Sequence, residues 1–598
     1  MKKILSLTIL ALLCNLLFSQ TDATAIYNRV DSIKKVGDSY CNAQKYNEAI
    51  AMYGEAAELA KKVDNGNNAY YAMAIYNMAY AYSKNGEHQK SVNCYIIAKD
   101  VYGGLNGTEN IKYAALLSQV GLEYEKMNEY QNAFNYLVQA LDVRKKVVGI
   151  EHADYMKTLN SIISICKEME DYQNTIKYYL EILEIKEKTL GTNHSSYAST
   201  LDNIASTYYT IKDNQNALKY YIKLGDVQKN TLGENDPEYI QTVFNISLMY
   251  YKMDDYPNTL KYALTIVDTY DKTSSKYVNL LAMIGYSYYY HEDYRSSLKY
   301  NVPAMETWKM LYGEENDGYI YLLTLVSNAY YATKDIPNAM NYLTQLEEIL
   351  EKNGNMSVDY SKTVYKIGKL YYDKGDYYNS LKYYLKTPKG SEDNPEDYAK
   401  ALSAIGVGYY NIGDYTASLK YHQQALEIRK MTPGVNSPDY IESLHHLGAV
   451  YEKLEDYKTA MEYYQLVLEY DRKNNGENSL EYATALSNIG NIYISKEDNS
   501  NALKYYQKSL EIKSKVCSDN SIDISNLLNN IGVTYENMGE YQTARKYLAQ
   551  SLEICKKVYG ENHPEYAKSL NNIGDAYLKM ADYQNALNCY MQAADIRK

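Results

Sequence analysis

Apolar side chains recur along this chain at three- and four-residue steps, in runs that alternate with short polar breaks. The last two runs show the pattern. From Tyr566 to Met580 apolar or small residues keep a helical period, Ala581-Asp582-Tyr583 breaks it, and a second run continues to Ile596. Such a unit is predicted to be a helix, a tight turn and an antiparallel helix.

The turn recurs at a nearly fixed interval. Successive turn positions are 42 residues apart in ten of thirteen steps, and 38, 41 and 38 residues apart at the steps into Tyr294, Tyr377 and Tyr415. This register predicts a solenoid of about fourteen helix-turn-helix repeats, each burying its apolar face against its neighbours. The turn positions are Tyr46, His88, Tyr130, Tyr172, Asn214, Tyr256, Tyr294, Ile336, Tyr377, Tyr415, Tyr457, Asn499, Tyr541 and Tyr583.

Small residues recur on both sides of the turn. Nine residues before it stands Gly in nine repeats, Ala or Ser in four, and the bulky Ile163 in one; three residues after it stands Ala, Ser or Thr. Glycine inside a helix costs up to about 1 kcal/mol relative to alanine, so its recurrence indicates a packing constraint. The two positions are predicted to lie where the helices of a repeat cross.

The linkers between repeats carry helix-ending and helix-starting residues. In Gly560-Glu-Asn-His563-Pro564-Glu, glycine is predicted to end one helix, while a polar residue caps the next and proline fits its first turn. His152, His194 and His563 stand in such linkers, where capping or solvent exposure is their expected role.

The small-residue spacing, the helix tyrosine at Tyr577, the turn Asp582-Tyr583 and the Ala586 position resemble the tetratricopeptide repeat over residues 27 to 598. The 42-residue repeat and the Ser569-Leu-Asn-Asn-Ile-Gly574 segment are similar to kinesin light chains and their bacterial relatives. The resemblance implies an all-α, right-handed superhelical solenoid whose first helices line a concave face and bind peptides or partner proteins. Fold alone does not fix the function.

Six repeats place an asparagine two residues before the small crossing residue. A side-chain amide there offers a donor and an acceptor to a bound peptide backbone, but for any single asparagine bonding to the neighbouring repeat is the favoured interpretation. The candidate groove residues are Asn77, Asn203, Asn245, Asn488, Asn530 and Asn572, of which the last three fall in consecutive repeats. A family variant that grips a C-terminal carboxylate with Lys and Asn is not reproduced here.

Net charge and aromatic content limit the classes of ligand that the chain is expected to bind. The formal charge is -12, or -14 without a leader that carries Lys2 and Lys3, and a negative protein repels phosphate backbones, so nucleic acid is not expected as a ligand. Tyrosine is the dominant aromatic, with 74 Tyr against 3 Phe and 1 Trp, and most of these rings are expected to pack between helices.

The N-terminus is typical of an export signal. Lys2 and Lys3 precede a mainly apolar stretch from Ile4 to Phe18, which is too short to span a membrane, so residues 1–19 are predicted to be a cleaved signal peptide. The mature protein is then periplasmic or secreted, and the leader resembles those of Bacteroidetes. Lipid attachment at Cys14 is not expected, because Leu13 precedes it, and no later stretch is apolar enough to span a membrane.

Six cysteines follow the leader, with no C-x-x-C pair and no histidine at metal-ligand spacing, so no metal site is expected. Buried thiols are the simplest interpretation, since Cys94, Cys166 and Cys589 replace recurring tyrosines. Export permits disulfides, and Cys517 and Cys555 lie on consecutive repeats, which leaves a bond between them open.

No catalytic motif or cofactor-binding loop is present, so the chain is not expected to be an enzyme. The pair His445-His446 points about 100° apart on a helix, which makes these residues poor joint ligands.

The middle of the chain is irregular, and it suggests a division into residues 20–270, 271–395 and 396–598. Pro303 is expected to interrupt a helix that begins near Tyr294, and residues 386–395 are the most loop-like. A change of superhelical curvature is predicted there, and a hinge is one form that it can take; uniform drift is the alternative.

The last repeat ends at Lys598 without a polar capping helix, which solenoids normally carry. Either another chain covers its apolar edge, or the repeats are part of a longer protein. Two functions stay open: a non-enzymatic scaffold that binds peptides or proteins, or the sensing or substrate-docking region of a larger signalling or caspase-like protease protein.

Overall fold

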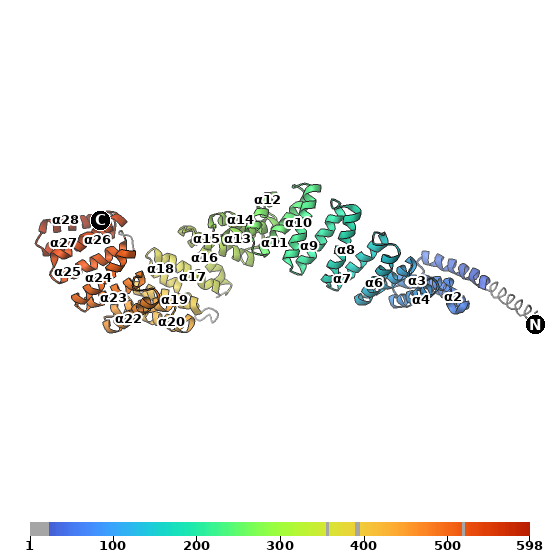
Figure 1. The fold of residues 1–598 in the computed structure, drawn as a ribbon, viewed down its shortest axis with the longest axis horizontal. Helices are drawn as coiled ribbons and strands as arrows, with labels where there is room; N and C mark the ends of the chain where they lie inside the picture. Colours follow the sequence, from blue (N-terminus) through green and yellow to red (C-terminus); the bar gives the residue numbers. More distant parts are fainter. Residues whose placement is uncertain (1–22, 355–357, 389–394, 517–520, 598) are drawn as a thin grey trace, which may run out of the picture. The chain divides into compact units, whose positions relative to one another are not determined.

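The computed structural model describes residues 23–354, 358–388, 395–516 and 521–597. Within these ranges the regular secondary structure is helical and contains no strand (Figure 1), so the predicted all-α fold is confirmed. Each repeat is a first helix followed by a second helix that packs against it.

The first helices open with residues 23–42 and continue with α3 (Ala69–Lys84), α5 (Ile111–Lys126), α7 (Ala153–Glu168), α9 (Ser195–Thr210), α11 (Pro237–Lys252), α13 (Ser275–Tyr290), α15 (Asp317–Ala332), α17 (Val358–Asp373), α19 (Pro395–Asn411), α21 (Pro438–Lys453), α23 (Leu480–Ser495), α25 (Ile522–Asn537) and α27 (Pro564–Lys579). The second helices are α2 (Tyr46–Lys61), α4 (His88–Asn106), α6 (Tyr130–Val147), α8 (Tyr172–Leu190), α10 (Asn214–Thr231), α12 (Tyr256–Ile266), α14 (Tyr294–Tyr312), α16 (Ile336–Lys352), α18 (Tyr377–Tyr384), α20 (Tyr415–Arg429), α22 (Tyr457–Asn474), α24 (Asn499–Val516), α26 (Tyr541–Tyr559) and α28 (Tyr583–Arg597). Short turns η1 (Asp64–Gly66), η2 (Val267–Thr269) and η3 (Lys430–Gly434) follow α2, α12 and α20.

The predicted turn positions set the helix boundaries. Each of the fourteen second helices in the described residues begins at its predicted turn position, and the residue two before has a positive φ. Only four of these residues are glycine; the others, such as Lys212 and Ala581, hold φ between 54° and 61° although a left-handed conformation costs a non-glycine residue about 1 kcal/mol or more. Helix packing on both sides therefore imposes the turn, since the residue at its centre does not favour it.

The two small positions meet where the helices of a repeat cross. A Cβ built at Gly121 would lie 3.1 Å from the carbonyl oxygen of Ala133, and one at Gly368 would lie 3.2 Å from that of Ser380. In another repeat the Ser418 hydroxyl donates to the carbonyl of Gly406 at 2.8 Å. The prediction that these residues permit a close helix crossing is confirmed.

Tyrosine pairs fill the space between the two helices of most repeats. In ten pairs, the tyrosine six residues before the second helix stacks on the one six residues after its start, with ring centroids 5.4–5.8 Å apart. Cys94, Cys166 and Cys589 stand at one of these two positions and are free thiols. Burial raises the pKa of Cys94 to about 11. The paired tyrosines thus have the packing role that was expected of most tyrosines in the chain.

The linker residues act as caps. Gly191 and Gly560 follow α8 and α26 with φ of 80° and 83°. The ring nitrogens of His152, His194 and His563 accept hydrogen bonds from backbone N–H groups in the first turn of the next helix, which confirms capping.

By their internal contacts, the residues form two compact bodies, one up to Ala304 and one from Met305 on. The boundary falls within α14, which continues through Pro303 to Tyr312; the expected interruption of that helix is wrong. The division at residues 270 and 395 and the hinge stay predictions, and part of the loop-like segment, residues 389–394, lies outside the described residues. The same holds for residues 1–22 and for Cys517, so the bond from Cys517 to Cys555 stays a prediction; Cys555 itself is buried.

Candidate functional site

A large cavity lies between first and second helices of the N-terminal body. It has a volume of about 920 Å³ and is lined by residues of α9, α10 and α11 together with Lys276 of α13. Asn203 and Asn245, two of the candidate residues, line it from equivalent positions of α9 and α11. A cavity of this size is within the range that accommodates ligands.

The side-chain amides of Asn203 and Asn245 each form one hydrogen bond within their own helix. Asn203 Nδ2 donates to the carbonyl of Ser199 in its own helix at 2.8 Å, and Asn245 Oδ1 accepts from Gln241 Nε2 at 3.1 Å. Among the described residues, Asn203 Oδ1 and Asn245 Nδ2 have no hydrogen-bond partner. The Asn203 oxygen can therefore accept a hydrogen bond from a ligand, and the Asn245 amide nitrogen, one repeat further on, can donate one.

A second cavity, of about 420 Å³, is formed by α25, α26 and α27 in the C-terminal body. Asn530 and Asn572 line it from equivalent positions. Asn572 Nδ2 donates to Asn529 Oδ1 of the preceding repeat at 2.6 Å, so part of its capacity goes to a contact between repeats.

The remaining two candidates do not line these cavities. Asn488 Nδ2 contacts His445 Nε2 of the preceding repeat at 2.6 Å, and Asn77 Nδ2 is buried without a partner in the described part of the chain. Of the three consecutive asparagines, the structure thus brings Asn530 and Asn572 to one cavity and places Asn488 in a contact between repeats.

Sequence reasoning missed the charged and amide side chains around the first cavity, which include Asp202, Glu238, Gln241 and Lys276. Glu238 and Lys276 share a repeat position but carry opposite charges, and Asp202 and Gln241 stand at two other positions, so no common residue type marks the set. The signal available was local: Asp202 precedes the candidate Asn203 directly in the sequence.

Polar bonds between repeats recur beside these cavities. The residue fourteen positions after the start of a second helix bonds a hydroxyl of the next first helix in four pairs: Arg144 with Thr158, Lys186 with Thr200, Gln228 with Thr242, and Arg429 with Ser443. In the last pair Arg429 is 1% exposed, and its Nη1 donates to the carbonyl of Asp439 at 2.9 Å and to Ser443 Oγ at 2.8 Å.

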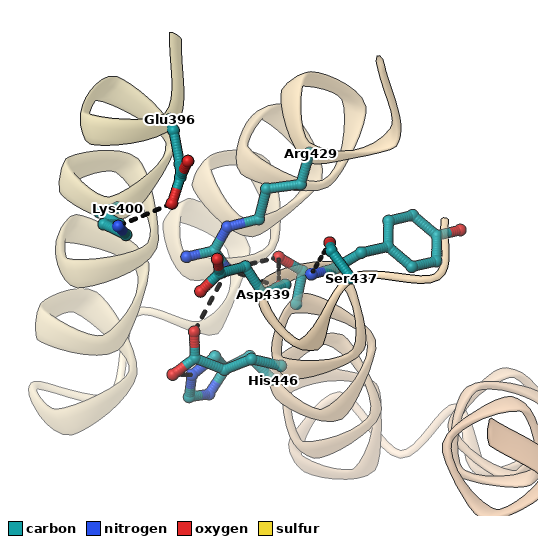
Figure 2. A network of polar contacts seen from close by, with 9 residues as sticks. Glu396, Lys400, Arg429, Ser437, Asp439 and His446 are labelled. Carbon is teal, nitrogen blue, oxygen red and sulfur yellow. Dashed lines mark hydrogen bonds and ion pairs between the residues drawn. The ribbon is translucent and has the colours of Figure 1, made fainter. Parts of the chain in front are cut away.

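Arg429 belongs to a wider polar network that borders a third cavity, of about 420 Å³ (Figure 2). Its Nη1 lies 3.4 Å from Glu442 Oε2, and Lys400 of the neighbouring α19 donates to Glu396 at 2.8 Å. The His446 ring stacks on His422 with centroids 4.8 Å apart. His445 and His446 thus engage different neighbours, as their orientation on the helix predicts.

His422 makes the stability of this region pH-dependent. Burial, reinforced by His446 and Arg429, lowers the pKa of His422 from its usual 6.5 to about 3. Between these pH values the unfolded chain binds a proton that the folded chain excludes, so stability falls as pH drops below 6.5. We expect a loss of about 2 kcal/mol from this residue between pH 6.5 and 4.5.

The variant His422→Leu tests this expectation, because leucines such as Leu137 and Leu548 fill the equivalent position, buried, in other repeats. Urea unfolding measured from pH 7 to 4.5 should give a shallower loss of stability for the variant than for the unaltered chain. Parallel curves would show that His422 is not responsible.

Comparison with protein-family models decides the assignment of the chain. The tetratricopeptide repeat model matches residues 28–95, 70–146, 154–224, 397–473, 460–515 and 523–598, which is more than half of the sequence. The chain belongs to the tetratricopeptide repeat (TPR) family. No curated protein matches this TPR chain.

Solved structures are similar to about a third of the chain. BtubC (BKLC) from P. vanneervenii is 20% identical over 37% of this chain and 89% of its own, with a TM-score of 0.32. A putative kinesin light chain from Podosopora anserina with nearly identical TPR-like repeats is 18% identical over 34% of this chain and 96% of its own, with a TM-score of 0.30. At TM-scores this low, these likenesses add nothing to the family assignment.

In the described ranges, no helix combines the length and apolar character that crossing a membrane requires. The same residues contain no group of three or more His, Cys, Asp or Glu side chains placed to hold a metal ion.

Proposed function

We propose that this TPR chain is a non-enzymatic scaffold that binds extended peptide segments of partner proteins on the face formed by its first helices. TPR repeats are protein-interaction modules, which supports a scaffold in general. The observation that carries the specific proposal is the pair of cavities lined by asparagines at equivalent repeat positions, Asn203 with Asn245 and Asn530 with Asn572. Amides repeated in this way suit the regularly spaced N–H and C=O groups of an extended peptide.

A selection from random octapeptides tests the proposal. Octapeptides displayed on phage are selected on the full chain, and the enriched peptides are synthesised and titrated by fluorescence anisotropy. The double variants Asn203→Ala/Asn245→Ala and Asn530→Ala/Asn572→Ala should each weaken the peptides that use that cavity about tenfold, the loss expected for one or two hydrogen bonds.

The control is Asn341→Ala, an exposed asparagine on the second helix α16, outside both cavities. It should leave every affinity unchanged. If neither double variant weakens binding of any selected peptide, the asparagine cavities are not the binding site and the proposal fails.

A second proposal concerns the end of the repeat array. The helix α28 exposes Tyr583, Leu587 and Met591, which are 68%, 54% and 59% accessible and lie one turn apart. At the position equivalent to Leu587, Leu503 is 8% exposed. This apolar face favours a covering segment or partner chain, as expected for a docking region of a larger signalling or protease protein.

Export from the cell is proposed from the leader sequence, and the intact mass of the native protein tests it together with the alternative function. A chain that starts near Gln20 and ends near Lys598 supports an exported scaffold. A native chain that still begins at Met1 contradicts export, and a mass larger by a domain favours the docking region.

A further inference from the structure

The cavity of the N-terminal body has an uneven charge distribution. Two carboxylates line it, Asp202 of α9 and Glu238 in the first turn of α11, while Lys276 is the one cation among its described lining residues. Lys276 Nζ donates to Gln241 Oε1, so its charge is already directed at an amide.

The two carboxylates act on each other. Partial burial and the charge of Glu238 raise the pKa of Asp202. In the described part of the chain, neither Asp202 nor Glu238 makes an ion pair, although many other carboxylates of the surface do, such as Glu184 with Lys188 at 2.6 Å. A pair of like charges that forms no ion pair is relieved by a bound cation that contacts it directly.

The remainder of the cavity suits a long side chain with a charged end. Leu224, Val227 and Leu232 contribute apolar surface, and Leu232 is 48% exposed. The methylene stem of lysine or arginine covers such surface while its charged end reaches a carboxylate.

We propose that this cavity binds a basic peptide: a lysine or arginine side chain pairs with Asp202 and Glu238, and Asn203 and Asn245 hold the peptide backbone. The proposal rests on the proposed function and names the class of peptide that this cavity takes. Charge complementarity selects the partner, because an acidic peptide would bring a third carboxylate beside two that already repel each other.

The octapeptides selected on the full chain provide the test. Those that lose affinity in Asn203→Ala/Asn245→Ala should share a lysine or arginine at one position. Replacing that residue by the uncharged citrulline or norleucine should weaken binding about tenfold, and Asp202→Asn or Glu238→Gln should each weaken the parent peptide about fivefold. The uncharged peptide should bind both carboxylate variants as it binds the unaltered chain, which shows that the carboxylates act through the basic residue.

Asp226→Asn is the matched control, because Asp226 is an exposed carboxylate of α10 that does not line the cavity. It should leave affinity unchanged at 150 mM salt, where surface charges are screened over about 8 Å. Two results would overturn the basic-peptide inference and leave the scaffold function intact. In the first, the peptides depend on Asn203 and Asn245 but show no preference for lysine or arginine. In the second, their affinity is the same in both carboxylate variants as in the unaltered chain. Peptides independent of the asparagines in both cavities would overturn the two together.

Discussion

Replacing Gly490 by valine should lower the stability of the repeats around α23 by about 3 kcal/mol, the upper part of the range for overpacking a core. A Cβ at Gly490 would lie 2.6 Å from Cε1 of Tyr506. That ring has no free space to move into, since it is 2% exposed and its hydroxyl donates to Asn491 Oδ1 at 2.6 Å. The two helices of the repeat must therefore separate.

Hydrogen exchange is the suitable measurement, because repeat proteins lose structure locally as well as globally. Amides of α23 and α24 should exchange faster in Gly490→Val, while those of α2 keep their protection. Gly54→Ala in α2 is the control: its Cβ would meet nothing closer than Met78 Sδ at 3.8 Å, so the variant should gain up to about 1 kcal/mol. Equal protection in Gly490→Val and the unaltered chain would contradict a tight crossing at this position.

The crossing was predictable because it recurs. Gly490 occupies one of fourteen equivalent positions, and a size restriction repeated at a fixed spacing is visible in a single sequence. The starts of the second helices were predictable for the same reason. Ile163 is the exception to the size rule, and it is accommodated in the core at 4% exposure.

The expectation that Pro303 interrupts its helix was wrong. A proline inside a helix removes one backbone donor and favours a kink, yet α14 continues past it to Tyr312. The sequence alone indicated the irregularity of this region, but not that the helix would extend through it.

The cavity residues were predictable only in part. Asn203 and Asn245 share a repeat position and so were found, whereas the repeats carry no other carboxylate at the position of Asp202, and the acidic residue that recurs at the position of Glu238 indicates only a helix start. Their proximity depends on how α9 packs beside α11, which a periodic pattern does not specify. The hydrogen bonds between repeats were missed because the residue that forms them, fourteen positions after the start of a second helix, is arginine, lysine or glutamine in different repeats.

Replacing Arg429 by alanine should lower the free energy of unfolding by about 3 kcal/mol, because charged hydrogen bonds are lost and a cavity is left behind. The other residues found at this repeat position provide the comparison. Arg429→Gln should cost only about 1 kcal/mol, because Gln228 at the equivalent position bonds Thr242 at 2.7 Å and a glutamine here has Ser443 as the corresponding partner. Arg472→Ala is the exposed control; its pairing with Glu477 at 2.7 Å lies on the surface and should be worth less than about 0.5 kcal/mol.

Urea unfolding of the three variants at pH 7 should rank them in that order, with hydrogen exchange placing the loss in α20 and α21. Burying a guanidinium carries a desolvation penalty, so a well-packed apolar replacement of similar volume can be neutral, but alanine leaves the space empty and the Ser443 hydroxyl without this donor. If Arg429→Ala proves as stable as the unaltered chain, the penalty cancels the bonds, and the network of Figure 2 does not hold α20 to α21. If alanine and glutamine cost the same, the hydrogen bond to Ser443 contributes nothing and only the packing of the long side chain matters.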